Sequence, residues 1–585
     1  MKDSTQGKIV DLRIIRRIYG FLKPYQFTFW LLVFLILCMA AVSPAVPLLI
    51  RYTLDHYVST DQISNLVRMF FYMLGVLFLH TGLQFSTSYL AGYLGQTVIK
   101  DIRVQLYNKI VHLKLAFFDH TPIGRLVTRT VSDIETLNDV FSEGLASIAG
   151  DLLQLVLIVG VMFYTDWRLT LVILATVPFM VFSTYVFKEY IKKSFNEVRL
   201  AVANLNSFVQ EHISGMMVVQ LFHAEERELK KFDQINVAHR DANIKGILAY
   251  SLYFPVADVI AAVGSGLIVW MASTYILNEE ITVGTLTAFI MFINLFFRPI
   301  RMLADRFNTL QMGIVSTERI LTLLDSEDYI QNNGVVLANE LKGHIQFKEV
   351  SFAYIEPEYV VKNVSFEVKP GSTVAIVGAT GAGKSSIIGL LSRMYDVQSG
   401  MIEIDGVALP DYEIGSLRRH ISVVLQDVFL FSSSIAYNIH LGDTEITHEQ
   451  IVEAAKAVGV HDFILSLPGG YDYEVMERGA TLSVGQRQLI SFVRALVHNP
   501  KIIVLDEATS SVDTESELLI QSAISTLMKG RTSVVIAHRL STIRHANQIL
   551  VMDKGEIKER GTHEKLLKMN GLYAQLYHLQ FSKSV

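Results

Sequence analysis

The chain has 585 residues, of which 18% are charged, and its formal net charge at pH 7 is −5. The charged share lies below the value of about a quarter that is usual for soluble domains, and the mean hydropathy is +0.36. These values exclude a wholly soluble protein, and the acidic balance argues against a nucleic-acid partner. The one cysteine, Cys38, excludes an intramolecular disulfide framework and a cysteine zinc cluster.

Long apolar runs gather in the first half of the chain, and a helix that crosses a bilayer needs about 20 such residues. We therefore predict six membrane-spanning helices, at residues 26–50, 69–98, 145–164, 169–187, 259–277 and 281–297. The run at 145–164 is interrupted by Asp151. The first run is too long for the core of a signal peptide, so we expect a retained membrane anchor.

Positive charge is unevenly distributed between the connections of these helices. Lysine and arginine gather before the first predicted span and after the second and fourth, whereas "NEE" at 278–280 is acidic. By the positive-inside rule, both termini are expected in the cytoplasm. Charged helical sequence continues beyond the second and fourth spans, which predicts two cytoplasmic hairpins with tips near 117–130 and 220–232.

After about residue 325 the apolar runs give way to a polar linker, which is followed by alternating strand-like and helix-like segments. This alternation predicts an α/β domain with a largely parallel sheet. We expect an all-α six-helix transmembrane domain with long cytoplasmic extensions over residues 1–325, and an α/β domain over 340–585.

The stretch "VAIVGATGAGKSS" at 374–386 combines an apolar strand with the spacing G-x-x-x-x-G-K-S. Its glycines allow backbone N–H groups to wrap a phosphate at a helix N-terminus, Lys384 reaches the terminal phosphates, and the Ser385 hydroxyl can ligate Mg²⁺. The multi-domain chain is therefore predicted to carry a P-loop ATPase domain. The nucleotide-binding residues predicted in this stretch are Gly378, Gly381, Gly383, Lys384, Ser385 and Ser386.

Two further strands are predicted to end at the phosphate site. "KIIVLDE" at 501–507 delivers Asp506, which fits the Mg²⁺ shell, and Glu507, which fits the base that orients the attacking water. In "SVVIAHRLST", His538 follows a buried strand and can donate a hydrogen bond to charge that develops on the γ-phosphate. Glu507 and His538 are the predicted catalytic residues.

Together these segments resemble the ATP-binding cassette (ABC) exporters, and in particular a half-transporter that fuses one membrane domain to one nucleotide-binding domain. The resemblance implies that Tyr354 in "VSFAY" stacks on adenine. It implies that Gln426 in "VVLQD" contacts Mg²⁺ and links the nucleotide site to the membrane domain. It further implies that "ERG" at 477–479 contacts the cytoplasmic hairpins, and that the loop ending at Asp513 crosses to a partner domain.

The stretch "LSVGQ" at 482–486 resembles the L-S-G-G-Q signature of the family. The resemblance implies that Ser483, Gly485 and Gln486 contact ATP held by the opposite domain, so that two half-transporters share each site. Val484 replaces the first glycine of the pattern. It is strained if the position needs a positive φ, and is tolerated if the position needs only close backbone approach.

Two kinds of dimer are compatible with Val484 in place of the signature's first glycine. A heterodimer would take an intact signature from a partner chain, but the presence of every catalytic element here favours a homodimer. The resemblance implies ATP-driven export or flipping of a hydrophobic drug-like compound or lipid across the cytoplasmic membrane by alternating access. The alternative is an ATP-gated channel or a regulatory membrane ATPase.

The substrate-contacting residues are the least constrained by the sequence. Asp258 is expected to face a cavity or to lie in the cytoplasmic extension, because a charge facing lipid is costly. Aromatic side chains of the fifth and sixth helices could line an apolar pocket, but aromatics at helical spacing are more often packing residues or lipid-facing. These residues are Tyr250, Tyr253, Phe254, Phe289, Phe292 and Phe296.

Overall fold

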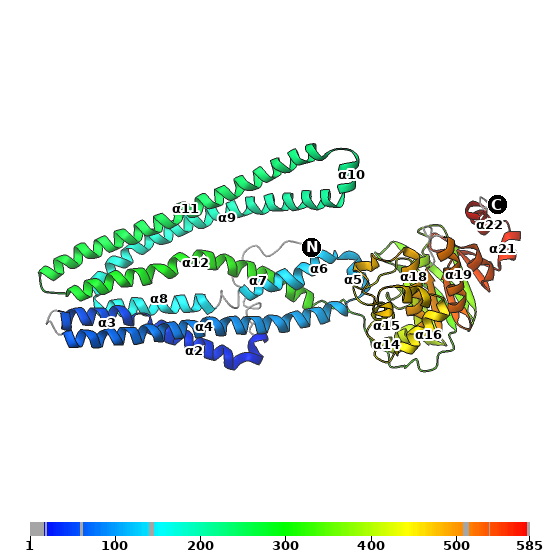
Figure 1. The fold of residues 1–585 in the computed structure, drawn as a ribbon, viewed down its shortest axis with the longest axis horizontal. Helices are drawn as coiled ribbons and strands as arrows, with labels where there is room; N and C mark the ends of the chain where they lie inside the picture. The colour runs from blue at the N-terminus through cyan, green and yellow to red at the C-terminus, as the bar shows by residue number, and fades with distance from the viewer. Residues whose placement is uncertain are drawn as a thin grey trace. The chain divides into compact units, whose positions relative to one another are not determined.

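The computed structural model describes residues 17, 20–58, 63–139, 146–506, 514–537 and 539–581. The chain divides into two compact units (Figure 1). The helical unit comprises residues 1–111 and 123–326, and the sheet unit comprises residues 112–122 and 327–585.

Among the residues that the structure describes, six helices of the helical unit are long and apolar enough to cross a membrane, which confirms the six predicted spans. They occupy Gly20–Val58, Ile63–Val111, Ile148–Thr165, Trp167–Ser214, Glu225–Leu277 and Val283–Ile300. The first is not one regular helix: α2 (Gln26–Val42) and α3 (Ala45–Thr53) are separated at Ser43 and Pro44. Proline lacks the N–H that would continue the helical hydrogen bonding, so the break falls there.

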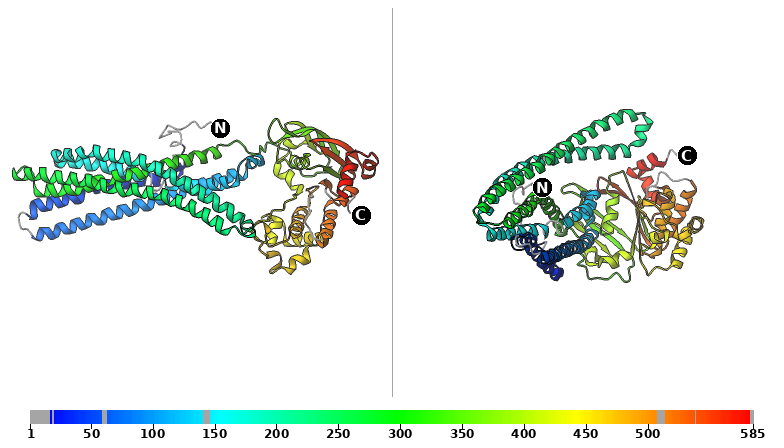
Figure 2. Two further views of the ribbon diagram at one scale, coloured as in Figure 1. Left: turned by 90° about the horizontal axis from the view of Figure 1, so that it is seen from above. Right: turned by 60° about the vertical axis from the view of Figure 1, so that its left-hand side comes forward.

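Two helices extend far beyond the thickness of a bilayer. The 48 residues of α9 (Trp167–Ser214) and the 53 residues of α11 (Glu225–Leu277) correspond to lengths of about 70–80 Å at 1.5 Å per residue. They pack side by side, as Figures 1 and 2 show, and are joined through α10 (Met216–Leu221). The turn of this hairpin lies at the tip predicted near 220–232.

Several helices of this unit, α3, α4, α7, α8, α9 and α11, pack against α12 (Val283–Leu324). Further bounds in this unit are Ile63–Val111 for α4, Ile123–Thr128 for α6, Ile134–Asp139 for α7 and Ala146–Thr165 for α8. A turn of π-helix, Arg129–Asp133, joins α6 to α7. The helix that precedes α6 in the chain, α5 (Leu115–His120), falls in the sheet unit.

The aromatic residues expected in the membrane helices are largely packed. Phe289, Phe292 and Phe296 are fully buried in a core shared by α8, α9, α11 and α12, and Tyr253 is buried against Phe187 of α9. For the three phenylalanines the packing alternative therefore holds and the pocket-lining alternative does not, because their rings fill the contact between helices. Asp258 lies on an exposed face of α11.

The described strands of the sheet unit form two sheets. A four-stranded antiparallel sheet has the order β2-β1-β4-β5, and a six-stranded sheet has the order β10-β9-β3-β8-β7-β6. In the second, only the pairing of β10 with β9 is antiparallel. The strand bounds are Ile345–Ala353 (β1), Tyr359–Val368 (β2), Thr373–Gly378 (β3), Ser399–Ile404 (β4), Val407–Ala408 (β5), Ile421–Val424 (β6), Ile502–Asp506 (β7), Thr532–Ile536 (β8), Gln548–Asp553 (β9) and Glu556–Gly561 (β10).

Helices cover both faces of the parallel sheet because its strands are apolar on both sides. Along β3, Val374 and Ile376 pack toward the antiparallel sheet and α13, whereas Ala375 and Val377 pack toward α16 and α18. The helix bounds are Lys384–Leu391 (α13), Ile414–Arg419 (α14), Ile435–His440 (α15), His448–Val458 (α16), His461–Ser466 (α17), Val484–Val497 (α18), Thr514–Met528 (α19), Leu540–His545 (α20), His563–Lys568 (α21) and Leu572–Phe581 (α22).

Candidate nucleotide-binding site

The phosphate loop joins the end of β3 to the start of α13, as the sequence predicts. Gly381 and Gly383 have φ values of +81° and +95°, which favour glycine. A Cβ atom on Gly378 would lie 2.2 Å from the carbonyl oxygen of Met552, and one on Gly383 would lie 2.4 Å from that of Val360. Larger residues would therefore displace the loop from the strands that hold it.

The Lys384 side chain folds back onto the backbone at the start of the phosphate loop. Its ammonium group donates hydrogen bonds of 2.9 Å to the carbonyl oxygens of both Gly378 and Ala379. Burial lowers the pKa of Lys384, and the negative charge of Asp506 partly offsets this effect. The arrangement holds a cation beside the backbone N–H groups at the start of α13, where a phosphate anion is favoured.

The structure brings Ser385 and Asp506 together. The Ser385 hydroxyl donates a hydrogen bond of 3.2 Å to Oδ2 of Asp506. Strand β3, which leads through the phosphate loop to Ser385, and strand β7, which ends at Asp506, are not neighbours, because β8 lies between them and pairs in parallel with both. Two hard oxygen donors beside a phosphate loop suit Mg²⁺, which keeps several of its waters and takes few protein ligands. Within the described residues no group of three or more His, Cys, Asp or Glu side chains could hold a metal.

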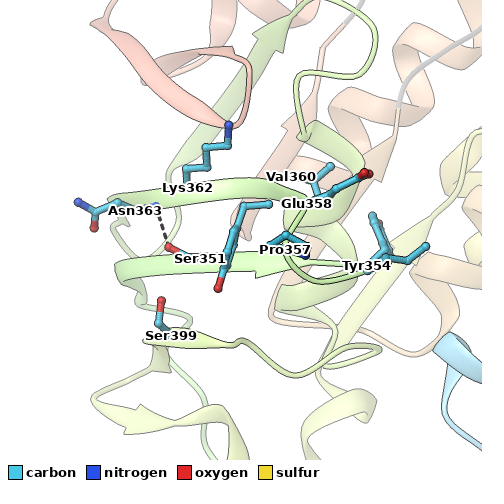
Figure 3. Close-up of a pocket in the computed structure, with 10 residues that line it drawn as sticks. Ser351, Tyr354, Pro357, Glu358, Val360, Lys362, Asn363 and Ser399 are labelled. Carbon is cyan, nitrogen blue, oxygen red and sulfur yellow. Dashed lines mark hydrogen bonds between the residues drawn. The ribbon is translucent and has the colours of Figure 1, made fainter.

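Tyr354 lies one residue beyond β1, with 42% of its surface exposed. Its hydroxyl shares a hydrogen bond of 3.1 Å with the hydroxyl of Ser386, which ties the ring to the first turn of α13. An open hollow of about 960 Å³ borders Tyr354 on the β1–β2 hairpin (Figure 3). Its lining includes Ser351, Pro357, Val360 and Lys362, but no residue of the phosphate loop. The half-exposed Tyr354 ring therefore borders an open hollow and is bonded to the helix that begins at the phosphate loop, while its predicted stacking on adenine stays a prediction.

Gln426 is exposed, two residues beyond β6. Because Val424 of β6 pairs in parallel with Leu505 of β7, the chain leaves both strands at the same edge of the sheet. Asp506 therefore ends one strand and Gln426 follows the end of the adjacent strand, at the edge where ligands of open α/β sheets bind.

The stretch "LSVGQ" forms the start of α18. Ser483 is its N-cap: the Ser483 hydroxyl accepts a hydrogen bond of 3.2 Å from the Gln486 N–H, and the Ser483 N–H donates one of 2.9 Å to Gln486 Oε1. Gly485 is buried, whereas Val484 is 46% exposed and has a helical backbone with negative φ. The structure therefore favours the interpretation in which valine is tolerated at position 484 without backbone strain.

The two predicted catalytic residues, Glu507 and His538, lie outside the described residues, as does Asp513. The strands that lead to them are described: β7 ends at Asp506 and β8 ends at Ile536. Their roles therefore stay predictions.

Contacts of α5 reveal residues that the sequence did not single out. The Tyr395 hydroxyl donates a hydrogen bond of 2.8 Å to Asp119 of α5, and the Tyr395 ring lies 5.2 Å from the ring of Tyr354. Tyr395 lies in an irregular segment between α13 and β4 and belongs to no phosphate-binding pattern. The signal available in the sequence was the acidic residue in "FFDH", within the tip predicted at 117–130.

Six membrane-crossing helices and a P-loop α/β unit in one chain define a multi-pass membrane protein with an ATP-binding domain. Residues 29–300 match the ABC transporter transmembrane region, and residues 361–510 match the ABC transporter family. The chain therefore belongs to the ABC transporters, and it has the organisation of an exporter with the membrane and ATP-binding regions fused.

Relatives support this assignment over nearly the whole chain. The uncharacterized ABC transporter ATP-binding protein YknV of Bacillus subtilis is 39% identical over 97% of this chain and 95% of its own length. A Staphylococcus aureus protein called a multidrug export ATP-binding/permease protein is 37% identical over 97% of this chain and 100% of its own length. The fold of such a half-transporter implies a dimer and a transported substrate.

Proposed function

We propose that the protein uses ATP binding and hydrolysis to export or flip a hydrophobic compound across the cytoplasmic membrane. The proposal rests on the hydrogen bond of 3.2 Å from the Ser385 hydroxyl to Asp506 Oδ2 beside the phosphate loop. The same chain has six described helices long and apolar enough to cross a membrane. On this proposal the membrane domain is residues 1–325 and the nucleotide-binding domain is residues 340–585.

In the proposed site, Tyr354 stacks on adenine and the phosphate loop from Gly378 to Ser386 holds the phosphates. Ser385 and Asp506, with Gln426, would hold Mg²⁺, which neutralises charge on the β- and γ-phosphates when bound. Glu507 orients the attacking water, and His538 donates a hydrogen bond to the developing charge. Translocation is the step to which this hydrolysis is coupled.

Each ATP is proposed to lie between two nucleotide-binding domains. Ser483, Gly485 and Gln486 of one protomer would complete the phosphate site of its partner, because α18 offers free N–H groups and the positive end of a helix. The unstrained, exposed Val484 supports a homodimer, since it leaves the Ser483 cap and Gly485 in a regular helix start. In the alternative heterodimer, a partner chain supplies the intact signature.

Alternating access is the proposed transport cycle. ATP shared by both domains favours the closed state because only that state contacts the γ-phosphate from both sides, and hydrolysis removes this advantage. We propose that both termini and the ATPase domain lie in the cytoplasm, as the positive-inside rule predicts.

A hydrophobic substrate, either drug-like or lipid, fits the membrane helices best. A largely apolar hollow of about 460 Å³ lies between α9 and α11 and is lined by Val172, Ala175, Leu267, Trp270, Met271, Thr274 and Tyr275. The name of the Staphylococcus aureus relative refers to multidrug export. An ATP-gated channel or regulatory ATPase is the alternative, and passive current through the open state would identify it.

The decisive experiment is steady-state ATPase of this chain, purified alone in lipid nanodiscs. We expect Mg²⁺-dependent turnover that falls by about 100-fold or more in Glu507→Gln, since general-base catalysis contributes about 10²–10⁴-fold. Val484→Gly should change the rate less than about threefold, because Val484 points outward without backbone strain. Negligible turnover in a sample that binds ATP would refute the homodimer and favour a partner chain with an intact signature.

A further inference from the structure

The turns that join α8 to α9 and α11 to α12 carry charged side chains that gather around Arg168. Asp166 caps the start of α9 and lies 3.4 Å from Nη2 of Arg168, and Glu280 accepts a hydrogen bond from Nη1 of the same guanidinium. The guanidinium carbon lies 4.2 Å from the centre of the Tyr275 ring of α11. Arg168 is therefore held from both helices, while 25% of its side chain stays exposed.

The hollow of about 460 Å³ between α9 and α11 begins beside this charged cluster. Tyr275, which contacts the guanidinium, is one of its lining residues, and Val172 lies one turn from Arg168 along α9. From Tyr275 to Leu267 the lining follows α11 for about 12 Å, at 1.5 Å per residue. The hydrocarbon of one leaflet is about 15 Å thick, so the hollow has room for most of the length of one acyl chain.

Exposed aromatic side chains mark the depth of this end of the hollow in the membrane. Tyr164 near the end of α8 and Trp167 at the start of α9 are 91% and 60% exposed, and Trp270, which lines the hollow, is 74% exposed. Tyrosine and tryptophan gather where membrane helices cross the headgroup region. Arg168 therefore lies at the level of the lipid headgroups, and the hollow leads from there into the hydrocarbon.

The charged cluster supplies the selectivity that the hollow lacks, because lipid tails are as apolar as leucine side chains. It combines one cation, Arg168, with three carboxylates, those of Asp166, Glu279 and Glu280. The exposed part of the guanidinium suits a phosphate, and the carboxylates suit a primary ammonium group, since charge-assisted hydrogen bonds are the strong ones. The excess of carboxylates disfavours a headgroup with a net negative charge.

We propose that the hollow and the cluster around Arg168 form a binding site for an aminophospholipid of the outer leaflet. One acyl chain occupies the hollow, the phosphate binds Arg168, and the primary ammonium binds Glu280. The inference goes beyond the proposed function, which leaves the exported compound open. It rests on that function only for the orientation that places these turns at the outer surface.

The chain has three tryptophans, so the fluorescence of one of them reports this site alone. Trp30→Phe with Trp167→Phe leaves Trp270, and Trp167→Phe with Trp270→Phe leaves Trp30, which is 59% exposed on α2. Each full-length protein is placed in phosphatidylcholine nanodiscs with equal fractions of dibrominated phosphatidylethanolamine, phosphatidylcholine or phosphatidylglycerol as quencher. At Trp270 we expect phosphatidylethanolamine to bind about fivefold more tightly than the other two, the factor that one exposed ion pair can supply. At Trp30 the three lipids should quench equally.

Four variants separate the charged cluster from the hollow. Arg168→Gln removes the phosphate contact, and Glu280→Gln removes the carboxylate that binds the ammonium. Ala175→Phe fills the hollow and leaves the charges unchanged, so it does not depend on how well the Arg168 contacts hold the helix ends. Each of the three should reduce the lipid preference at Trp270 to less than about twofold. Ala262→Phe is the matched control, since Ala262 is exposed on α11 but does not line the hollow.

Several outcomes would overturn the lipid site. Equal quenching of Trp270 by the three lipids would show that only bulk lipid lies against the hollow. No quenching of Trp270 in nanodiscs where Trp30 is quenched would show that a second copy of the chain covers this face. Stronger quenching by phosphatidylglycerol would refute the role of the ammonium.

ATPase turnover of the same samples keeps this inference apart from the proposed function. Absence of turnover in protein that keeps the lipid preference at Trp270 would refute the proposed function and leave the lipid site standing. Normal turnover without the preference would refute the lipid site alone.

Discussion

At the scale of single residues, the phosphate loop depends on positions that exclude a side chain. Gly381 and Gly383 both have positive φ, but their surroundings differ: a Cβ atom on Gly381 meets nothing within 4 Å, whereas one on Gly383 meets the carbonyl oxygen of Val360 at 2.4 Å. The two glycines therefore separate the cost of backbone conformation from the cost of a steric clash.

Gly383→Ala is expected to reduce ATP affinity by more than about tenfold, while Gly381→Ala has a smaller effect. Both variants carry a conformational cost of about 1–2 kcal/mol for left-handed backbone in a non-glycine residue. Only Gly383→Ala also pushes the loop away from Val360. Nucleotide titration and thermal unfolding of both variants measure the difference, and equal losses would show that φ alone matters.

At the scale of secondary structure, α18 shows how one serine serves stability and binding together. Ser483 caps the helix through a reciprocal pair of hydrogen bonds with Gln486. The same hydroxyl is proposed to contact the γ-phosphate of the partner protomer. Substitution by alanine removes both roles, so it cannot tell them apart.

Ser483→Asp is expected to keep the helix cap and to lose ATPase activity. Aspartate caps helices about as well as serine, whereas alanine costs about 1 kcal/mol, and a carboxylate repels the phosphate. The unfolding temperature of Ser483→Asp should therefore match the wild type, with turnover at least about tenfold lower for a lost 1.4 kcal/mol or more. Full activity in Ser483→Asp would remove Ser483 from the proposed phosphate contacts.

At the scale of the whole molecule, the proposed sites are completed only by a second chain. In the proposed dimer, one protomer would supply the phosphate loop with Lys384, and the other would supply the helix start at Ser483. Two inactive variants that fail in different halves of the site should therefore complement one another when they share a dimer.

Lys384→Ala and Ser483→Asp are each expected to be inactive, and their co-expression should restore turnover. A mixed dimer joins the intact phosphate loop of one variant to the intact signature of the other, which gives one functional site. With random pairing and independent sites, about a quarter of wild-type turnover is expected for a symmetric dimer. No recovery in a sample shown to contain mixed dimers would contradict shared sites or independent turnover, and adding wild-type chain to each variant distinguishes these cases.

Much of the architecture was predictable because it follows from local pattern. Six apolar runs of bilayer length marked the spans, and the glycine spacing at 378–383 marked the phosphate loop, since each depends on neighbouring residues alone. The sequence did not indicate the break at Pro44 within the first span, and it left open whether Phe289 and its neighbours pack, face lipid or line a pocket. Helical periodicity does not distinguish a residue that packs from one that lines a pocket.

The sequence by itself determined the class of protein, its six spans and the chemistry of the phosphate loop, because composition and spacing act locally. Tertiary structure decided which distant residues meet. Strand order placed β8 between β3 and β7 and still brought Ser385 within 3.2 Å of Asp506. Packing joined Asp119 to Tyr395, 276 positions apart. Such contacts depend on the register and packing of whole elements, which no short stretch of sequence encodes.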